Sequence, residues 1–241
     1  LWPALMGEPL LHNKEVFEMI AYAKSQGVEV HLNTNLALFK KEMLNSLMDC
    51  GVHEILIGLD GATAETYEKI RRGAKFDRVL KNIHLILNEK VTRKIDIPLV
   101  TLQFIVMNEN AHEEKSFIDY WKKSGETVSL KIKPRLGWSD GVEPWERIKN
   151  VKKEDRDLPC TYLLRQMTIF WNGHVPQCDG DWDGQTNFGN VNHQSLEEIW
   201  LEGLKKIRDR HMLLDFNFPP CNKCEDWQGG RANWIECGVD K

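Results

Sequence analysis

The sequence predicts an α/β fold with a parallel β-sheet, followed by a small cysteine-rich domain. Within residues 1–133, short apolar runs typical of strands alternate with amphipathic patterns typical of helices, and four of the six cysteines fall in the last third of the chain. Repeated strand–helix alternation requires right-handed crossovers and therefore a parallel sheet, either closed as a barrel or open and doubly wound. With 241 residues, 41% of them hydrophobic, the chain has room for one large domain and a small appendage.

Strands and helices alternate in a regular order in the first part of the chain. Strands are predicted at residues 1–6, 28–32, 54–59, 97–107 and 128–132. The intervening helices are predicted from apolar stripes at Val16, Phe17, Ile20 and Ala23; at Met43, Leu44, Leu47 and Met48; at Val79, Leu80, Ile83, Ile86 and Leu87; and at Phe117, Ile118 and Trp121. Asn110 followed by Glu113 predicts a capped start for the last of these helices.

The second part of the chain is less regular. Residues 137–157 are polar without periodicity, which predicts a linker or lid. A β-hairpin is expected from residues 167–171 and 174–177, joined by an Asn-Gly turn. The capping-box sequence at 195–198 predicts the start of a helix with apolar residues on its buried face.

Composition argues against two classes of partner. The net charge of −4 gives no basic footprint for nucleic acid, and no apolar run is long enough to span a membrane. The cysteine content is typical of an intracellular protein, and we expect a cytoplasmic one. Because the sequence starts at Leu1, without an initiator Met and inside a predicted strand, we expect it to be part of a longer protein.

The cysteines of the tail form a candidate metal site. The candidate ligands are Cys160, Cys178, Cys221 and Cys224. Thiolates are soft ligands, and four of them hold either a zinc ion or an iron–sulfur cluster. A zinc ribbon usually has two facing CxxC pairs, whereas only one is present here, so the spacing leaves both metals open. A disulfide is the weaker alternative at this low cysteine density, and Cys50 is expected to be a buried helix residue and no ligand.

Polar residues follow the predicted strands, where the carboxyl ends of parallel strands meet at one edge of the sheet. They are Gly7-Glu8-Pro9, Asn33-Thr34-Asn35, Asp60-Gly61 and Asn108, with Lys131 and Lys133 on the last strand. Each group alone is explained by turn or capping chemistry. Their succession along one edge favours a binding site.

Other charged residues are weaker candidates for substrate contacts. Lys131 and Lys133 lie on the same side of their strand, where one is a candidate base or substrate clamp, although solvated or carboxylate-paired lysines are more common. Asp179, Asp181 and Asp183 suit a cationic or amino-bearing substrate. Aspartates in such a loop more often build turns, and we favour that interpretation for them.

Together these motifs resemble the radical S-adenosylmethionine (radical SAM) enzymes that carry a C-terminal SPASM or twitch extension. The matching stretches are 7–11, 33–35, 59–61, 67–71 and 104–107 with Asn110, and in the tail Cys160, Gly173, Cys178, 189–191, 196–200, Cys221 and Cys224. Their order is that of the family, and they cover nearly the whole chain.

The resemblance implies a partial (β/α)6 TIM-like barrel that lacks its first strand here. It implies a radical SAM barrel over 1–136, a linker or lid over 137–157, and a SPASM or twitch domain over 158–241. In the family, a CxxxCxxC loop after the first strand holds a [4Fe–4S] cluster that cleaves S-adenosylmethionine to a 5′-deoxyadenosyl radical. This chain has no CxxxCxxC, so we expect that segment upstream of Leu1; the alternative is a degenerate, non-catalytic homologue.

The resemblance also assigns cofactor contacts. The matching positions are Gly7, Glu8, Pro9, Thr34, Asn35, Asp60 and Arg71. The Gly-Glu-Pro turn would hold the amino group of S-adenosylmethionine, the polar residues after the next two strands would lie beside its ribose and methionine, and Arg71 would pair with its carboxylate. Met6, Leu36 and Gly58 depart from the family pattern.

The four tail cysteines match the shorter twitch arrangement with one auxiliary [4Fe–4S] cluster, similar to that of cyclitol dehydrogenases. The implied activity is oxidation or rearrangement of a small hydroxylated substrate, with the auxiliary cluster as electron acceptor and flavodoxin or ferredoxin as reductant. Modification of a peptide substrate is the second interpretation. A binding scaffold with a structural four-cysteine zinc site is the non-enzyme alternative.

Overall fold

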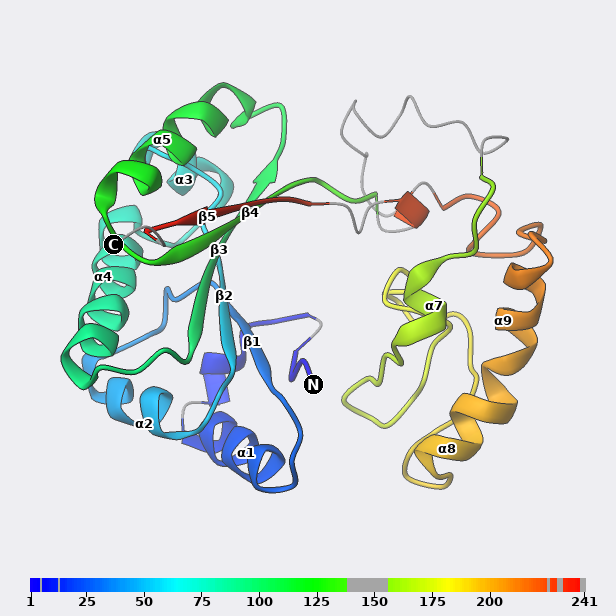
Figure 1. Cartoon of the computed structure of the whole chain (residues 1–241). Helices are drawn as coiled ribbons and strands as arrows, with labels where there is room; N and C mark the ends of the chain where they lie inside the picture. The colour runs from blue at the N-terminus through cyan, green and yellow to red at the C-terminus, as the bar shows by residue number, and fades with distance from the viewer. Residues whose placement is uncertain (5, 13, 138–155, 225, 229–231, 239–241) are drawn as a thin grey trace. The chain divides into compact units, whose positions relative to one another are not determined.

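The structure is a computed structural model that describes residues 1–4, 6–12, 14–137, 156–224, 226–228 and 232–238. The chain forms two compact units (Figure 1), which are described separately. The first contains Leu1–Lys133 and Ala232–Lys241, and the second contains Pro134–Arg231. The sequence placed the whole tail after residue 158 in the cysteine-rich domain, whereas the structure returns the last residues to the first unit.

The first unit is built on a five-stranded sheet in the order β1-β2-β3-β4-β5 (Figure 1). The strands are β1 His31–Thr34, β2 Glu54–Gly58, β3 Leu99–Val106, β4 Val128–Pro134 and β5 Asn233–Cys237. The first three are parallel, with His31 opposite Glu54 and Glu54 opposite Leu99. β5 is antiparallel to β4, with Lys131 opposite Trp234.

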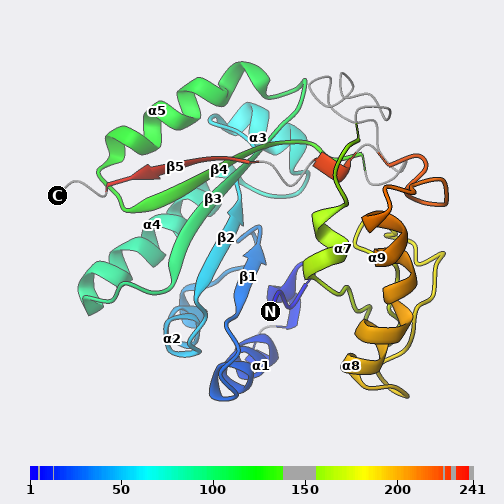
Figure 2. The ribbon, with the colours of Figure 1, turned by 45° about the vertical axis from the view of Figure 1, so that its right-hand side comes forward.

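Helices connect the strands and lie along one side of the sheet, a relation that Figure 2 shows from a second angle. They are η1 Pro9–His12, α1 Lys14–Ser25, η2 Lys41–Met43, α2 Leu44–Asp49, α3 Ala64–Ile70, α4 Phe76–Arg93, η3 Ala111–Glu113 and α5 Glu114–Ser124. The predicted apolar stripes form the buried faces of α1, α2, α4 and α5, except that Met43 is buried in η2 and that Leu80 and Ile118 are only partly buried. Within the described residues, no helix is long and apolar enough to cross a membrane.

The sheet has one apolar face and one more polar face. Along β4, Leu130 and Ile132 are buried, whereas Lys131 and Lys133 between them are partly exposed. Fully burying one aliphatic side chain contributes roughly 1.5–3 kcal/mol, so the helix-covered face holds the unit together. Along β4 the other face carries Ser129, Lys131 and Lys133, and helices on one side of the sheet are typical of a parallel barrel rather than of a doubly wound sheet.

The strand predictions need three corrections. The strand predicted at residues 28–32 lies at His31–Thr34, so Asn33 and Thr34 belong to the strand itself. Residues 1–6 form no strand in their described part; only the backbone of Leu1 pairs, donating to Glu29 O at 2.6 Å and accepting from His31 N at 2.9 Å. β5 was not predicted because it is a short edge strand in a polar tail, with Trp234 exposed and its partner far away in sequence.

The second unit contains short helices around a small core. They are α7 Thr161–Arg165, α8 Leu196–Glu198, the π-helical turn η5 Ile199–Gly203, α9 Lys205–Met212 and η6 Asp226–Gln228. The predicted capping box is confirmed: Ser195 Oγ accepts from Glu198 N at 3.1 Å, and Glu198 Oε2 accepts from Ser195 N at 2.8 Å. Val175, Ile199 and Leu204 form the buried core behind it.

The predicted hairpin is only a tight turn. Gly173 N donates to Phe170 O at 2.9 Å, with Gly173 at φ +82°, but the described residues on either side form no paired strands. Val175 instead exchanges backbone hydrogen bonds with Phe188 and Gly189. Of the predicted linker or lid at 137–157, residues 138–155 lie outside the described part of the chain.

Candidate functional site

Glu8 joins the first two polar segments at the strand-end edge. Its Oε1 accepts from Thr34 Oγ1 at 2.6 Å and from Leu10 N at 3.1 Å, and its Oε2 accepts from Asn35 N at 2.8 Å. Gly7 before it adopts φ +86°, a conformation that a glycine reaches without strain. The Gly-Glu-Pro turn is thus attached to the end of β1 by its carboxylate.

Asp60 and Arg71 form the second part of this edge. Asp60 Oδ2 accepts from Arg71 Nε at 2.7 Å, and its Oδ1 accepts from Ile105 N at 2.8 Å at the end of β3. Asp60 is 1% exposed, and burial raises its pKa while the Arg71 guanidinium opposes that rise. Gly58 gives Arg71 its space, because a Cβ there would lie 2.8 Å from Arg71 Nη2.

Asn110 does not cap the helix that follows it, contrary to our prediction. Its side chain makes no hydrogen bond to η3 and is fully buried. It accepts from Met107 N at 2.7 Å and donates to Asp60 O at 3.2 Å and to Ile105 O at 2.9 Å. Asn110 therefore links the carboxyl ends of β2 and β3, which no local sequence pattern indicated.

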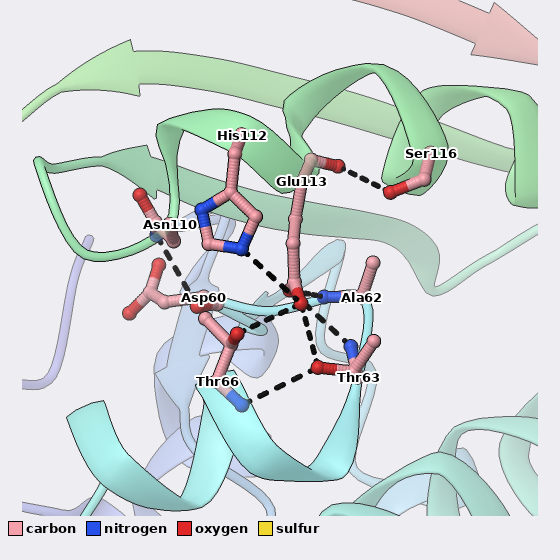
Figure 3. Close-up of polar contacts among 8 residues, drawn as sticks. All are labelled: Asp60, Ala62, Thr63, Thr66, Asn110, His112, Glu113 and Ser116. Atoms are coloured by element: carbon pink, nitrogen blue, oxygen red, sulfur yellow. Dashed lines mark hydrogen bonds and ion pairs between the residues drawn. The ribbon is translucent and has the colours of Figure 1, made fainter.

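Glu113 holds the loop that follows Asp60 (Figure 3). Its carboxylate accepts from Ala62 N at 2.7 Å, from Thr63 Oγ1 at 2.6 Å and from Thr66 Oγ1 at 2.7 Å. The sequence pattern predicts Glu113 only as a capping partner of Asn110, and no local pattern indicates these contacts with the loop after β2. Burial acts to raise the pKa of Glu113, but these hydrogen bonds together lower it.

Lys131 and Lys133 lie on the more polar face of the sheet, as predicted. Lys131 Nζ is 5.1 Å from the centroid of the Trp234 ring, and burial lowers its pKa while the charge of Glu54 opposes that change. The charge of Lys133 acts on Asp60 in the same sense as Arg71. Both lysines therefore remain candidates for contacts with a bound molecule.

The four tail cysteines gather in the second unit. Cys160, Cys178 and Cys224 line one pocket, together with Leu136, Tyr162, Asp179, Gly180, Asp226 and Trp227. Burial and the charge of Cys224 raise the pKa of the Cys221 thiol to about 12, and burial, then Asp179 and Cys221, raise that of Cys178. All six cysteines are free thiols. A soft, four-sulfur donor set in a buried region fits a thiolate-ligated metal centre.

In the described part of the chain, no three Cys, His, Asp or Glu side chains are arranged around a single metal ion. Cys50 is buried as predicted, although it lies at the C-cap of α2 rather than within the helix, and its Sγ donates to Leu47 O at 3.2 Å. His211 lies against Cys221, and burial, with the charges of Arg156 and Arg210, lowers its pKa to about 4. Its imidazole is therefore neutral near pH 7.

In the aspartate loop, residues 179–183, Asp181 and Asp183 bond mainly to residues that follow closely in the chain. Asp181 is buried and accepts from the backbone N–H groups of Gln185 and Thr186, both at 2.9 Å. Asp183 accepts from Gln185 Nε2 at 2.7 Å. These contacts support the turn interpretation for both residues, whereas Asp179 lines the cysteine pocket.

An α/β unit with polar parallel-strand ends, joined to a separate four-thiol unit, defines the class of protein as a barrel-type enzyme scaffold with a metal-cluster domain. Comparison with known families agrees. The radical SAM superfamily matches residues 4–120, and SPASM, an iron-sulfur cluster-binding domain, matches residues 160–225. The chain belongs to the radical SAM superfamily and carries a C-terminal SPASM domain. These domains imply S-adenosylmethionine and [4Fe–4S] clusters as cofactors.

Several curated relatives match this chain over most of its length. An AdoMet-dependent heme synthase of Methanosarcina barkeri is 32% identical over 91% of this chain and 72% of its own length. An uncharacterised protein of Treponema pallidum is 24% identical over 93% of this chain. The chain spans 63% of the length of that second relative.

Solved structures show the same fold. BtrN in complex with AdoMet and 2-DOIA covers all of this chain, which covers 74% of BtrN, with a TM-score of 0.56 and 13% identity. SuiB of Streptococcus suis bound to the precursor peptide SuiA matches 92% of this chain and 58% of its own, with a TM-score of 0.52 and 13% identity. At these identities the likeness concerns the fold alone.

Replacing Glu113 by Gln should lower the free energy of unfolding by roughly 1–3 kcal/mol, because a buried carboxylate that accepts several hydrogen bonds is lost. Its pKa lies below the unfolded value of about 4.3, so its charge stabilises the fold above that pH, and the contribution disappears as the pH falls through the folded pKa. Urea unfolding at pH 7 and at lower pH measures both effects. The matched control is Glu109→Gln, since Glu109 is exposed. Equal stability of the two variants would contradict the role of Glu113 in holding the loop after Asp60.

Replacing both Cys221 and Cys224 by Ala should remove about four iron and four sulfide per chain from full-length protein reconstituted without oxygen. The reason is that the pair supplies half of the proposed donor set. Metal and sulfide analysis makes the measurement, with Cys50→Ala as the control that retains the full content. Zinc in place of iron at wild-type stoichiometry would instead support the structural zinc site.

Proposed function

We propose that this protein is a radical SAM enzyme that oxidises a small organic substrate and uses an auxiliary [4Fe–4S] cluster as electron acceptor. The observation that carries the proposal is the gathering of Cys160, Cys178 and Cys224 around one pocket, with Cys221 beside them. Four protein thiols would fill every ligand position of a cubane cluster. Such a cluster has no open iron for substrate, which favours electron transfer over substrate binding.

The strand-end edge is the proposed S-adenosylmethionine site. The proposed contacts are Gly7, Glu8, Pro9, Thr34, Asn35, Asp60 and Arg71. The Glu8 carboxylate is engaged by Thr34 and Asn35, so it would shape the turn whose backbone oxygens accept from the cofactor's ammonium group. Arg71 presents its Nε and Nη2 to Asp60, and the remaining guanidinium donors are available in principle to a carboxylate.

The chemistry divides between the cofactor and this chain's own residues. When bound at the strand-end edge, S-adenosylmethionine would supply the radical chemistry that removes a hydrogen atom from the substrate. The four tail cysteines would hold the auxiliary cluster, which would take up the one electron that the substrate must lose, and a base of this chain would accept the proton. Lys131, whose pKa is lowered by burial, is the proposed base, and Lys133 is the proposed clamp. A carrier such as flavodoxin or ferredoxin would supply the first electron and remove the last.

The substrate is proposed to be a small molecule. The heme synthase relative and an Fe-coproporphyrin III synthase of Methanosarcina barkeri, 30% identical over 47% of this chain, favour an iron tetrapyrrole over the hydroxylated ring expected from the sequence. Tetrapyrroles of this kind carry carboxylates, which suit the paired lysines of β4. A peptide substrate is the second candidate, favoured by a mycofactocin maturase relative of Mycolicibacterium smegmatis at 23% identity.

Replacing Arg71 by Ala should weaken S-adenosylmethionine binding roughly tenfold to a hundredfold, the equivalent of about 1.5–3 kcal/mol for a lost charge-assisted hydrogen bond. Isothermal titration of the full-length reconstituted protein measures the change. The adjacent and exposed Arg72→Ala is the matched control. Circular dichroism must show that both variants are folded, because Arg71→Ala leaves Asp60 buried without its cation. Unchanged affinity in a folded Arg71→Ala protein would exclude the assigned contact.

The electron-acceptor role is tested with the Cys221→Ala, Cys224→Ala double variant in turnover assays. The variant should still form 5′-deoxyadenosine, because the tail cysteines are not needed to cleave the cofactor, but it should form little oxidised product. Fe-coproporphyrin III, a hydroxylated cyclitol and a peptide are compared as substrates by mass spectrometry. Normal product from the folded variant would eliminate the acceptor role, and an unfolded variant would support a structural role for the metal instead.

A further inference from the structure

The sulfur of Cys221, one of the four candidate ligands, already accepts two side-chain hydrogen bonds. Gln177 Nε2 donates to Cys221 Sγ at 2.8 Å, and His211 Nε2 lies 3.2 Å from the same sulfur. Both donors are buried, with Gln177 3% exposed and His211 fully enclosed. Water therefore cannot replace either donor without rearrangement.

The His211 ring is oriented so that its proton faces the sulfur. Its Nδ1 accepts from the backbone N–H of Cys160 at 3.3 Å, which places the ring proton on Nε2. Phe216 and Phe218 pack edge-on against the imidazole, with centroid distances of 5.1 and 5.7 Å. One histidine thus connects two of the candidate cysteine ligands, the backbone of Cys160 and the sulfur of Cys221.

Gln177 is held through its backbone. Its backbone N–H donates to Thr186 Oγ1 at 2.8 Å, and Thr186 is in turn bound by Asp181, whose Oδ2 accepts from Thr186 N at 2.9 Å. The aspartate loop therefore has a purpose that the sequence did not reveal. Through Thr186, Asp181 fixes the backbone of Gln177, from which the amide reaches Cys221.

We propose that Gln177 and His211 are positioning residues that raise the reduction potential of the auxiliary cluster by hydrogen bonding to the Cys221 sulfur. An N–H···S bond withdraws electron density from the thiolate and stabilises the more negative, reduced state of a cluster. A higher potential makes the cluster a better acceptor of the substrate's electron. The inference rests on the proposed function, in which Cys221 is a ligand of that cluster.

The potential is measured by redox titration of the full-length reconstituted protein, followed by EPR, with S-adenosylmethionine added to separate the signal of the cofactor-binding cluster. Gln177→Leu and His211→Phe should each lower the ratio of reduced to oxidised auxiliary cluster about tenfold at a given potential, a shift of about −59 mV for one electron. His211→Gln, which keeps an N–H near the Nε2 position, should restore most of the wild-type ratio.

Matched controls in the same unit are Gln185→Leu and His174→Phe, whose side chains bond to Asp183 and to the Thr186 carbonyl rather than to sulfur. Their potentials should equal that of the wild type. This inference is wrong if the cluster requires Cys221 but the Gln177→Leu and His211→Phe variants keep the ratio of reduced to oxidised cluster, at a given potential, within twofold of the wild-type ratio. If Cys221→Ala keeps the cluster at an unchanged potential, the ligand set of the proposed function is wrong instead.

A wild-type measurement covers the case in which a substitution removes the cluster. Protein labelled with 15N in its histidine rings should show, by pulsed EPR, a nitrogen coupling to the reduced auxiliary cluster, because His211 Nε2 contacts a ligand sulfur. The coupling should be absent from the unlabelled spectrum at the 15N frequency. Absence of any imidazole coupling in labelled protein would overturn the role of His211.

Discussion

The strand-end edge depends on two buried carboxylates, Asp60 and Glu113. Removing a carboxylate from water costs several kcal/mol, so each must be offset by hydrogen bonds or by a cation. Asp60 obtains them from Arg71 and from the backbone at the end of β3, and Glu113 obtains them from the loop between β2 and α3. These contacts hold the loops after two neighbouring strands in one arrangement. A cofactor that binds there would meet a preformed surface.

Sequence reasoning recovered the fold class because parallel strands and amphipathic helices have different periods, and the helix stripes proved to be the buried faces. It also found the strand-end residues, since Glu8, Thr34 and Asn35 fall in recognisable turns and do meet. It misassigned Glu113, because the spacing from Asn110 satisfied a local capping pattern while the actual partner, Thr63, lies 50 residues away. β5 was missed for a similar reason, since only pairing with β4 makes its polar sequence a strand.

In the cysteine-rich unit, too, the spacing of residues along the sequence did not predict contacts between residues that are distant in the chain. The four candidate ligands were identified from sequence, yet spacing could not show that Cys221 receives hydrogen bonds from Gln177 and His211. Neither residue belongs to a motif, and each reaches the sulfur only through the packing of this unit. Asp181, which we expected to build a turn, does so, and it also binds Thr186, whose hydroxyl accepts from the backbone of Gln177. The spacing of the four cysteines therefore identifies the candidate ligands but not the residues that donate hydrogen bonds to them.

Iron anomalous diffraction from crystals of the reconstituted full-length protein tests the central claim most directly. The account predicts an iron cluster within coordination distance of the sulfurs of Cys160, Cys178, Cys221 and Cys224, with the Gln177 and His211 donors against Cys221. An anomalous signal at the zinc edge alone, or iron bound away from these sulfurs, would contradict it.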